Sequence, residues 1–196
     1  SPILYTLSKY QPAAECGKPV IYLYPKNDTN VSVKVEPNGG LKFSEPTYNG
    51  GWNVWATTQS ELTNLSDGAS YPYLFWEGKA YNYQKPDKGF VLKRESVARD
   101  MAVLLKRLGL NEKESSDFME FWQPKLEVKP FVYVTFLSQE KFDQLAPLTV
   151  TPKPDRIIRV FMDYEPLDQF VLVPPLKIIT PTRTGFTVVE WGGRLR

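Results

Sequence analysis

Apolar and polar residues alternate along much of the first third of the chain, with the period of two that is typical of β-strands. Residues 31–35 alternate valine with polar side chains, and residues 52–57 place a tryptophan, a valine and an alanine on one face. Glycine pairs at 39–40 and 50–51 each follow an asparagine and supply turn residues. We therefore expect an antiparallel meander or small sandwich, in which 31–35 turns directly into a strand at 41–43.

A second kind of strand is apolar without alternation. Residues 20–24, Val-Ile-Tyr-Leu-Tyr, lie between two prolines, and a short continuous run of this kind is usually buried on both faces. Similar apolar or β-branched runs follow in the second half. They predict further strands at 131–137, 157–162, 170–173, 176–179 and 186–190.

The period changes to that of a helix in the middle of the chain. Residues 93–108 carry apolar side chains three and four apart, and Gly109 is placed to cap the helix end. Asn111 is suited to cap a second helix, which we expect to stop at Pro124. The two helices would form an αα-hairpin. The predicted fold class is α+β: a mostly antiparallel β-sheet or sandwich with this hairpin packed on it.

Composition does not shift sharply anywhere, so we expect one domain rather than two. Residues 1–17 are interpreted as a lead-in or tether, followed by a single α+β domain over 18–196. Within it we distinguish a β-rich part at 18–92, the helical hairpin at 93–123 and a second sheet portion at 129–196. The chain begins Ser1-Pro2, which indicates a processed protein or an excised domain.

Charge and composition exclude several function classes. The 24 basic and 22 acidic residues leave a net charge of +2, too little to argue for nucleic acid. The chain has no histidine and one cysteine, which excludes histidine-based catalytic triads, zinc knuckles and internal disulfides. Phosphate-binding glycine loops are absent, and no apolar run reaches the ~18 residues that cross a bilayer. We expect no cofactor, no metal and no transmembrane segment within this chain.

Three carboxylates are candidates for catalysis. Glu77 and Glu190 each adjoin a tryptophan at a predicted strand end, and Asp163 ends another strand. Glycoside hydrolases use two such carboxyls about 5–10 Å apart, and an apolar indole raises the pKa of a neighbouring carboxyl. The commoner alternative is that these residues are capping or turn carboxylates beside core tryptophans.

Cys16 is the fourth catalytic candidate because it is unique. Glu15 would raise the pKa of its thiol and Lys18 would lower it, and no histidine can serve as its base. A structural thiol is the expected role. The alternatives are a disulfide to another chain or a point of attachment, and a catalytic nucleophile.

Aromatic residues are dense at 71–76 and could form a binding strip. With strand period two, one set of side chains is expected in the core and the other at the surface, where aromatic rings can stack on a sugar or a peptide. The candidate ligand-binding residues are Tyr71, Tyr73, Trp76 and Trp191.

Three blocks carry a resemblance: Cys-Gly-Lys-Pro-Val-Ile-Tyr-Leu-Tyr-Pro at 16–25, Tyr-Pro-Tyr-Leu-Phe-Trp-Glu-Gly at 71–78 and Gly-Phe-Thr-Val-Val-Glu-Trp-Gly-Gly at 185–193. From Cys16 onward the chain resembles an uncharacterised bacterial domain family that is often exported or membrane-anchored and has no known activity. The resemblance implies a bacterial source and an extracytoplasmic position, secreted or anchored through a segment upstream of Ser1.

The function these observations favour is a non-enzymatic, envelope-associated binding or structural module. Its expected partner is a cell-envelope glycan or protein. The alternatives are a glycan-acting hydrolase that uses Glu77 and Glu190, and covalent chemistry at Cys16.

Overall fold

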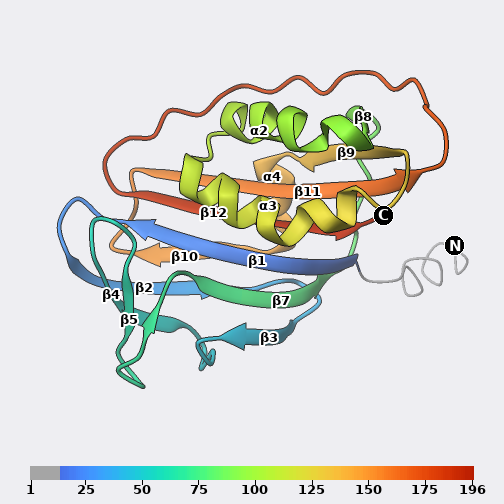
Figure 1. The fold of residues 1–196 in the computed structure, drawn as a ribbon. Helices are drawn as coiled ribbons and strands as arrows, with labels where there is room; N and C mark the ends of the chain where they lie inside the picture. The colour runs from blue at the N-terminus through green and yellow to red at the C-terminus, as the bar shows by residue number, and fades with distance from the viewer. Residues whose placement is uncertain (1–13) are drawn as a thin grey trace, which may run out of the picture.

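The computed structural model describes residues 14–196, which fold into two β-sheets and a helical layer (Figure 1). The seven-stranded sheet has the order β3-β7-β1-β12-β11-β9-β8, and the five-stranded sheet has the order β10-β2-β4-β5-β6. The strands are β1 (Ala14–Tyr24), β2 (Thr29–Val35), β3 (Leu41–Glu45), β4 (Trp52–Ala56), β5 (Leu62–Asn64), β6 (Ser70–Tyr71), β7 (Leu74–Ala80), β8 (Phe90–Lys93), β9 (Phe131–Leu137), β10 (Leu148–Thr151), β11 (Arg156–Leu167) and β12 (Thr187–Leu195). The helices are η1 (Arg94–Ser96), α2 (Val97–Arg107), α3 (Glu112–Leu126) and α4 (Gln139–Leu145).

The elements form three layers with two cores between them. One core lies between the two sheets, and the second lies between the seven-stranded sheet and helices α2 and α3, which cover its other face in Figure 1. Strands β11 and β12 are parallel, whereas the other pairs within the sheets are antiparallel. The predicted α+β class with a mostly antiparallel sheet and an αα-hairpin is confirmed.

Strand β1 lies near the middle of the seven-stranded sheet and serves both cores. Ile21 and Leu23 point into the core between the sheets, while Val20 and Tyr22 point toward the helices. All four side chains are fully buried. The continuous apolar run at 20–24 is therefore explained, because each successive side chain enters a different core.

The helical hairpin follows the predicted caps with one difference. The side chain of Asn111 accepts from Glu114 N, and Asn111 N donates to the carboxylate of Glu114, which completes a capping box. Helix α3 was expected to stop at Pro124, but it continues to Leu126. A proline removes one backbone N–H donor, and here that loss falls in the last turn of the helix. The helix continues past it because Leu126 is fully buried there, and its burial stabilises the last turn.

The expected hairpin from residues 31–35 to 41–43 is wrong, because β2 and β3 lie in different sheets. Asn38 is the reason. Its side chain accepts from Tyr81 N and donates to Tyr81 O, and Gly39 N donates to Lys79 O. These bonds hold the turn against the end of β7, so the chain passes from the five-stranded to the seven-stranded sheet instead of folding back on β2.

Strands predicted at 170–173 and 176–179 are also absent. Residues 168–186, here called the strap, connect the parallel strands β11 and β12 without regular structure, and in Figure 1 they arch beyond β8 and α2. Pro174 and Pro175 lack the N–H groups that a sheet ladder needs. The strap is held at separate points, such as the bond from Gly89 N to Pro174 O and the two bonds from Arg183 to Glu114.

The lead-in expected at 1–17 overlaps the fold, because β1 begins at Ala14 and Cys16 pairs with Gly78 of β7. Residues 1–13, which include most of that lead-in, lie outside the described residues.

Candidate functional site

Glu190 is buried in the core between the sheets and is neutralised there by Arg159. Arg159 Nη2 and Nε lie 3.1 and 3.2 Å from Glu190 Oε2, Nη2 also donates to Oε1 at 3.3 Å, and neither side chain is exposed to solvent. Arg159 also donates to Ala146 O at 2.7 Å and to Asp143 at 3.0 Å. Burial raises the pKa of Glu190 above its usual value, and the charge of Arg159 opposes that shift.

Glu77 does not reach Glu190, because the two lie on opposite faces of the seven-stranded sheet. Glu190 shares its face with Val188, which packs between the sheets. Glu77 lies opposite Phe43 and on the face of Phe75, which packs toward the helices. The carboxylate pair predicted for a glycan hydrolase is therefore not formed.

Asp163 belongs to a separate buried cluster in the C-terminal half of β11. Arg196 Nε donates to it at 2.8 Å, the hydroxyl of Tyr83 donates to its other oxygen, and Arg194 lies 3.6 Å away. Asp163 lies opposite Arg194 in the β11–β12 register, four residues beyond Glu190, which corresponds to roughly 13 Å along the strand. Asp163 thus fixes the C-terminus, and it is too far from Glu190 to act with it.

Cys16 is buried and protonated. Burial raises the pKa of its thiol to about 12, and the negative charge of Glu190 adds to the shift. The side chain packs in the core between the sheets. These properties fit the structural thiol that the sequence favoured and oppose a nucleophilic role.

The predicted aromatic strip is divided among three places. Trp76 and Trp191 are fully buried, in different cores, so neither has a surface on which a ligand can stack. Tyr73 is half-buried and packs edge-on against Tyr22. Tyr71 lies at the edge of the five-stranded sheet, where its hydroxyl donates to Asp67. The strip fails because the chain changes sheets between β6 and β7.

An exposed aromatic residue that the sequence analysis did not select lies on the outer face of the five-stranded sheet. Trp55 is 42% exposed, whereas the other four tryptophans are 3% exposed or less. The alternation in β4 buries Trp52 and Val54 and turns Trp55 outward. That alternation was visible in the sequence, and a tryptophan on the polar face of a strand was the signal that could have identified it.

Small neutral side chains surround Trp55. Asn30 of β2 lies opposite it on one side and Thr63 of β5 on the other, and Ser70 continues the row. In the next row Ser32 donates to Asn53 Oδ1 at 2.6 Å, which leaves the amide group of Asn53 free to donate. We call this surface the Trp55 face; its outward residues are Asn30, Ser32, Lys34, Asn53, Trp55, Thr63, Ser70, Thr149 and Thr151.

Within residues 14–196, no group of three or more acidic or cysteine side chains is arranged to hold a metal ion. No helix in the same part of the chain combines the length and apolar character needed to cross a membrane.

Comparison with known proteins gives one informative match. No protein-family model matches the chain, and no solved structure matches it. A stretch of 64 residues is 47% identical to a protein of Butyrivibrio fibrisolvens described as "Uncharacterized protein in bglA 3'region". The match covers 31% of this chain and 65% of that protein, so less than two thirds of the relative is spanned. The chain is thus similar to part of an uncharacterised bacterial protein.

Proposed function

We propose that this protein is a non-enzymatic binding module that presents the Trp55 face to a neutral carbohydrate chain. The observation that carries the proposal is one exposed indole on the outer face of a sheet, surrounded by asparagine, serine and threonine. An indole gives an apolar plane on which a sugar ring can stack, and short amide and hydroxyl side chains can exchange hydrogen bonds with sugar hydroxyls.

The shape and charge of the face support this ligand class. Its five strands at about 4.8 Å spacing make a platform about 19 Å across, which suits an extended chain better than a compact metabolite. Lys34 is its one charged outward residue on the strands, although 23% of the whole chain is charged. A charge-poor face favours an uncharged ligand over a nucleic acid or an acidic polymer.

The proposal includes the location expected from the sequence. A bacterial envelope module would meet glycan outside the cytoplasm, and the bacterial relative is consistent with that source. Fractionation of cells that express the native gene, followed by immunodetection, tests the extracytoplasmic position separately from binding.

Binding is tested by co-sedimentation with insoluble glycans, for which we choose purified peptidoglycan sacculi, cellulose and xylan. Wild-type protein is expected in the pellet with at least one of them. Trp55→Ala should weaken that binding about tenfold or more, because truncating a central aromatic anchor costs about 2 kcal/mol. Acrylamide quenching gives a second readout: the single exposed tryptophan should be shielded when a soluble fragment of the bound glycan is added.

Phe43→Ala is the matched control, since Phe43 is 50% exposed but lies on β3 of the other sheet. It should bind like the wild type. Equal binding by Trp55→Ala and Phe43→Ala would show that the Trp55 face is not the site, and no binding to any glycan by the wild type would reject a carbohydrate ligand.

A further inference from the structure

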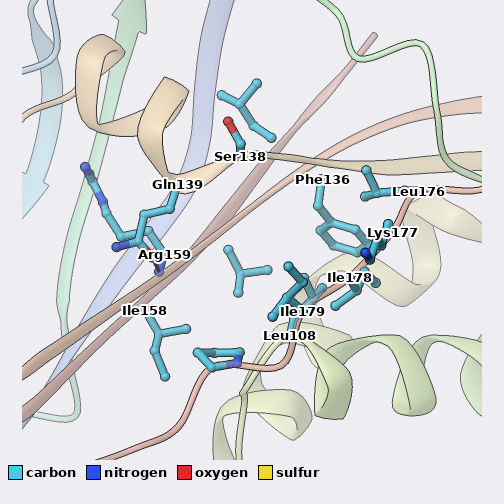
Figure 2. Close-up of a pocket in the computed structure, with 13 residues that line it drawn as sticks. Leu108, Phe136, Ser138, Gln139, Ile158, Arg159, Leu176, Lys177, Ile178 and Ile179 are labelled. Atoms are coloured by element: carbon cyan, nitrogen blue, oxygen red, sulfur yellow. Dashed lines mark hydrogen bonds between the residues drawn. The ribbon is translucent and has the colours of Figure 1, made fainter.

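A pocket of about 360 Å³ lies between the seven-stranded sheet and the strap (Figure 2). One wall is the end of β9 at Phe136 and the start of α4. The other is the strap from Leu176 to Pro181, and Leu108 at the C-cap of α2 and Ile158 of β11 also line it. Most of the lining side chains are aliphatic or aromatic, so the pocket offers a largely apolar surface.

The backbone of β9 is unpaired where it meets this pocket. Strand β8 pairs with β9 only as far as Val134. The carbonyl of Val134 faces β8, because a Cβ on Gly89 would lie 2.6 Å from it. Residues two apart in a strand direct their N–H and C=O groups to the same side, so Phe136 directs both groups toward the pocket.

Neither of these groups has a partner. Within residues 14–196, Phe136 N–H and C=O make no hydrogen bond outside the β-ladder, and the β8 ladder ends before reaching them. Phe136 is nevertheless only 4% exposed. Buried backbone groups in folded proteins are nearly always paired, so this edge lacks a partner that it is built to take.

The ladder stops because the chain before β8 turns away. Lys88 O accepts from the hydroxyls of Tyr133 and Thr135, and Gly89 N donates to Pro174 O of the strap. At Gly89, therefore, one backbone lies between β9 and the strap. Further along β9, toward Phe136, the pocket takes the place of that backbone between β9 and the strap. At the Gly89 end the pocket is therefore about as wide as one strand.

The strap offers a second unpaired edge. Within the described chain, residues 176–182 make no backbone–backbone hydrogen bond. Leu176 and Ile178 pack toward the helical core, while Lys177 and Ile179 point outward. This alternation is that of an extended segment with its backbone groups available on its flanks.

The polar side chains of the pocket are already engaged, with one exception. The amide of Gln139 bonds Ile157 O and Arg159 N, and the hydroxyl of Ser138 accepts from Lys141 N. The guanidinium of Arg159 is bound on the other face of the sheet. Lys177 has no ion-pair partner within residues 14–196, so it alone contributes an uncompensated charge.

We propose that this pocket accepts a β-strand: an extended segment of about four residues from a partner protein pairs with Phe136 on one side and the strap on the other. Its apolar side chains face Ile158 and Ile178, and an acidic side chain lies beside Lys177. This inference does not rest on the Trp55 face, which lies on the other sheet.

Acetylated, amidated pentapeptides test the proposal by NMR titration of the isotope-labelled chain. The probe is Thr-Val-Asp-Val-Thr, compared with Thr-Val-Lys-Val-Thr and Thr-Val-Pro-Val-Thr. The aspartate peptide should shift the amide resonances of Phe136 and Ile178 and slow hydrogen exchange at Phe136. The lysine peptide should bind about two- to fivefold more weakly, as expected for an exposed ion pair, and the proline peptide should not bind, since it lacks the central N–H.

Lys177→Glu should reverse the preference between the aspartate and lysine peptides, and Lys42→Glu on β3, at the far edge of the sheet, should not. If the proline peptide binds as tightly as the aspartate peptide, the pocket is a site for small apolar molecules instead. If the amide of Phe136 is protected from hydrogen exchange without peptide, and the molecular mass in solution rises with protein concentration, a second copy of the chain fills the pocket. Either result, or no shift at millimolar peptide, overturns the proposal.

Discussion

The buried ion pair between Arg159 and Glu190 allows a sharp test of the core. We consider Arg159→Met, which has a similar length and no charge. It leaves the carboxylate of Glu190 in a site with no solvent exposure, where Trp76 and Cys16 are its polar neighbours and the negative charge of Asp143 repels it. Removing one partner of such a pair costs about 3–5 kcal/mol, a large share of the 5–15 kcal/mol typical of a folded domain.

The cost has a pH dependence whose sign follows from the pKa of Glu190. Without Arg159, the buried carboxyl holds its proton to a higher pH than in the unfolded chain. The penalty is therefore small at about pH 4, where the folded carboxyl is protonated and the unfolded one mostly so, and it grows as the pH rises. Urea unfolding at pH 4 and pH 7 should show a much larger loss at pH 7, with the melting temperature lowered by about 6–20 °C there.

Two further variants separate this explanation from simple loss of packing. Asp143 is 52% exposed, so Asp143→Asn should cost no more than about 1 kcal/mol. The double variant Arg159→Met/Glu190→Leu removes the unpaired charge and should recover most of the loss. A loss below about 1 kcal/mol in Arg159→Met, or no recovery in the double variant, would refute the reasoning.

Two other predictions concern β1 and β12. At pH 8, a thiol reagent should label Cys16 about a thousandfold more slowly in the native state than in urea, because its pKa of about 12 leaves little thiolate. The same pKa shift lowers the stability of the folded state above about pH 8.5, where the unfolded thiol ionises and the folded one does not. Rapid labelling of the native protein would contradict the burial of Cys16. Gly193→Ala should destabilise by about 1–3 kcal/mol, because its Cβ would lie 2.9 Å from Trp122 Cζ2. Thermal unfolding of Gly193→Ala alone and with Trp122→Phe checks this, since the smaller ring should relieve the clash.

The sequence predicted elements well where one local pattern was sufficient. The period of α2 and the cap at Asn111 depend on residues a few positions apart, so the hairpin could be located. The continuous run in β1 predicted burial on both faces correctly. The Asn-Gly-Gly turn at 38–40 was different: its hydrogen bonds go to Lys79 and Tyr81, some 40 residues away, and no local pattern could reveal that the chain changes sheets there.

The candidate carboxylate pair could not be judged from the sequence for the same reason. Glu77 and Glu190 look alike in sequence, because each adjoins a tryptophan at a strand end. Their faces are set by which strand lies beside each one, and the partner that neutralises Glu190, Arg159, comes from 31 residues earlier. The residue type indicated which chemistry a carboxylate could perform, but its burial and its hydrogen-bonding partners decided whether it could perform it. Trp55 was the opposite case, since its outward direction followed from the alternation in β4 alone.

The two proposed surfaces are separated in a way that makes them independent. The Trp55 face lies on the outside of the five-stranded sheet, and the β-strand slot lies beyond β9 at the edge of the seven-stranded sheet; the core between the sheets separates them. Neither surface shares a residue with the other, so substitutions in each should act additively. A module with both occupied would hold a glycan and a protein strand at once, and simultaneous binding with unchanged affinities is the result that this separation requires.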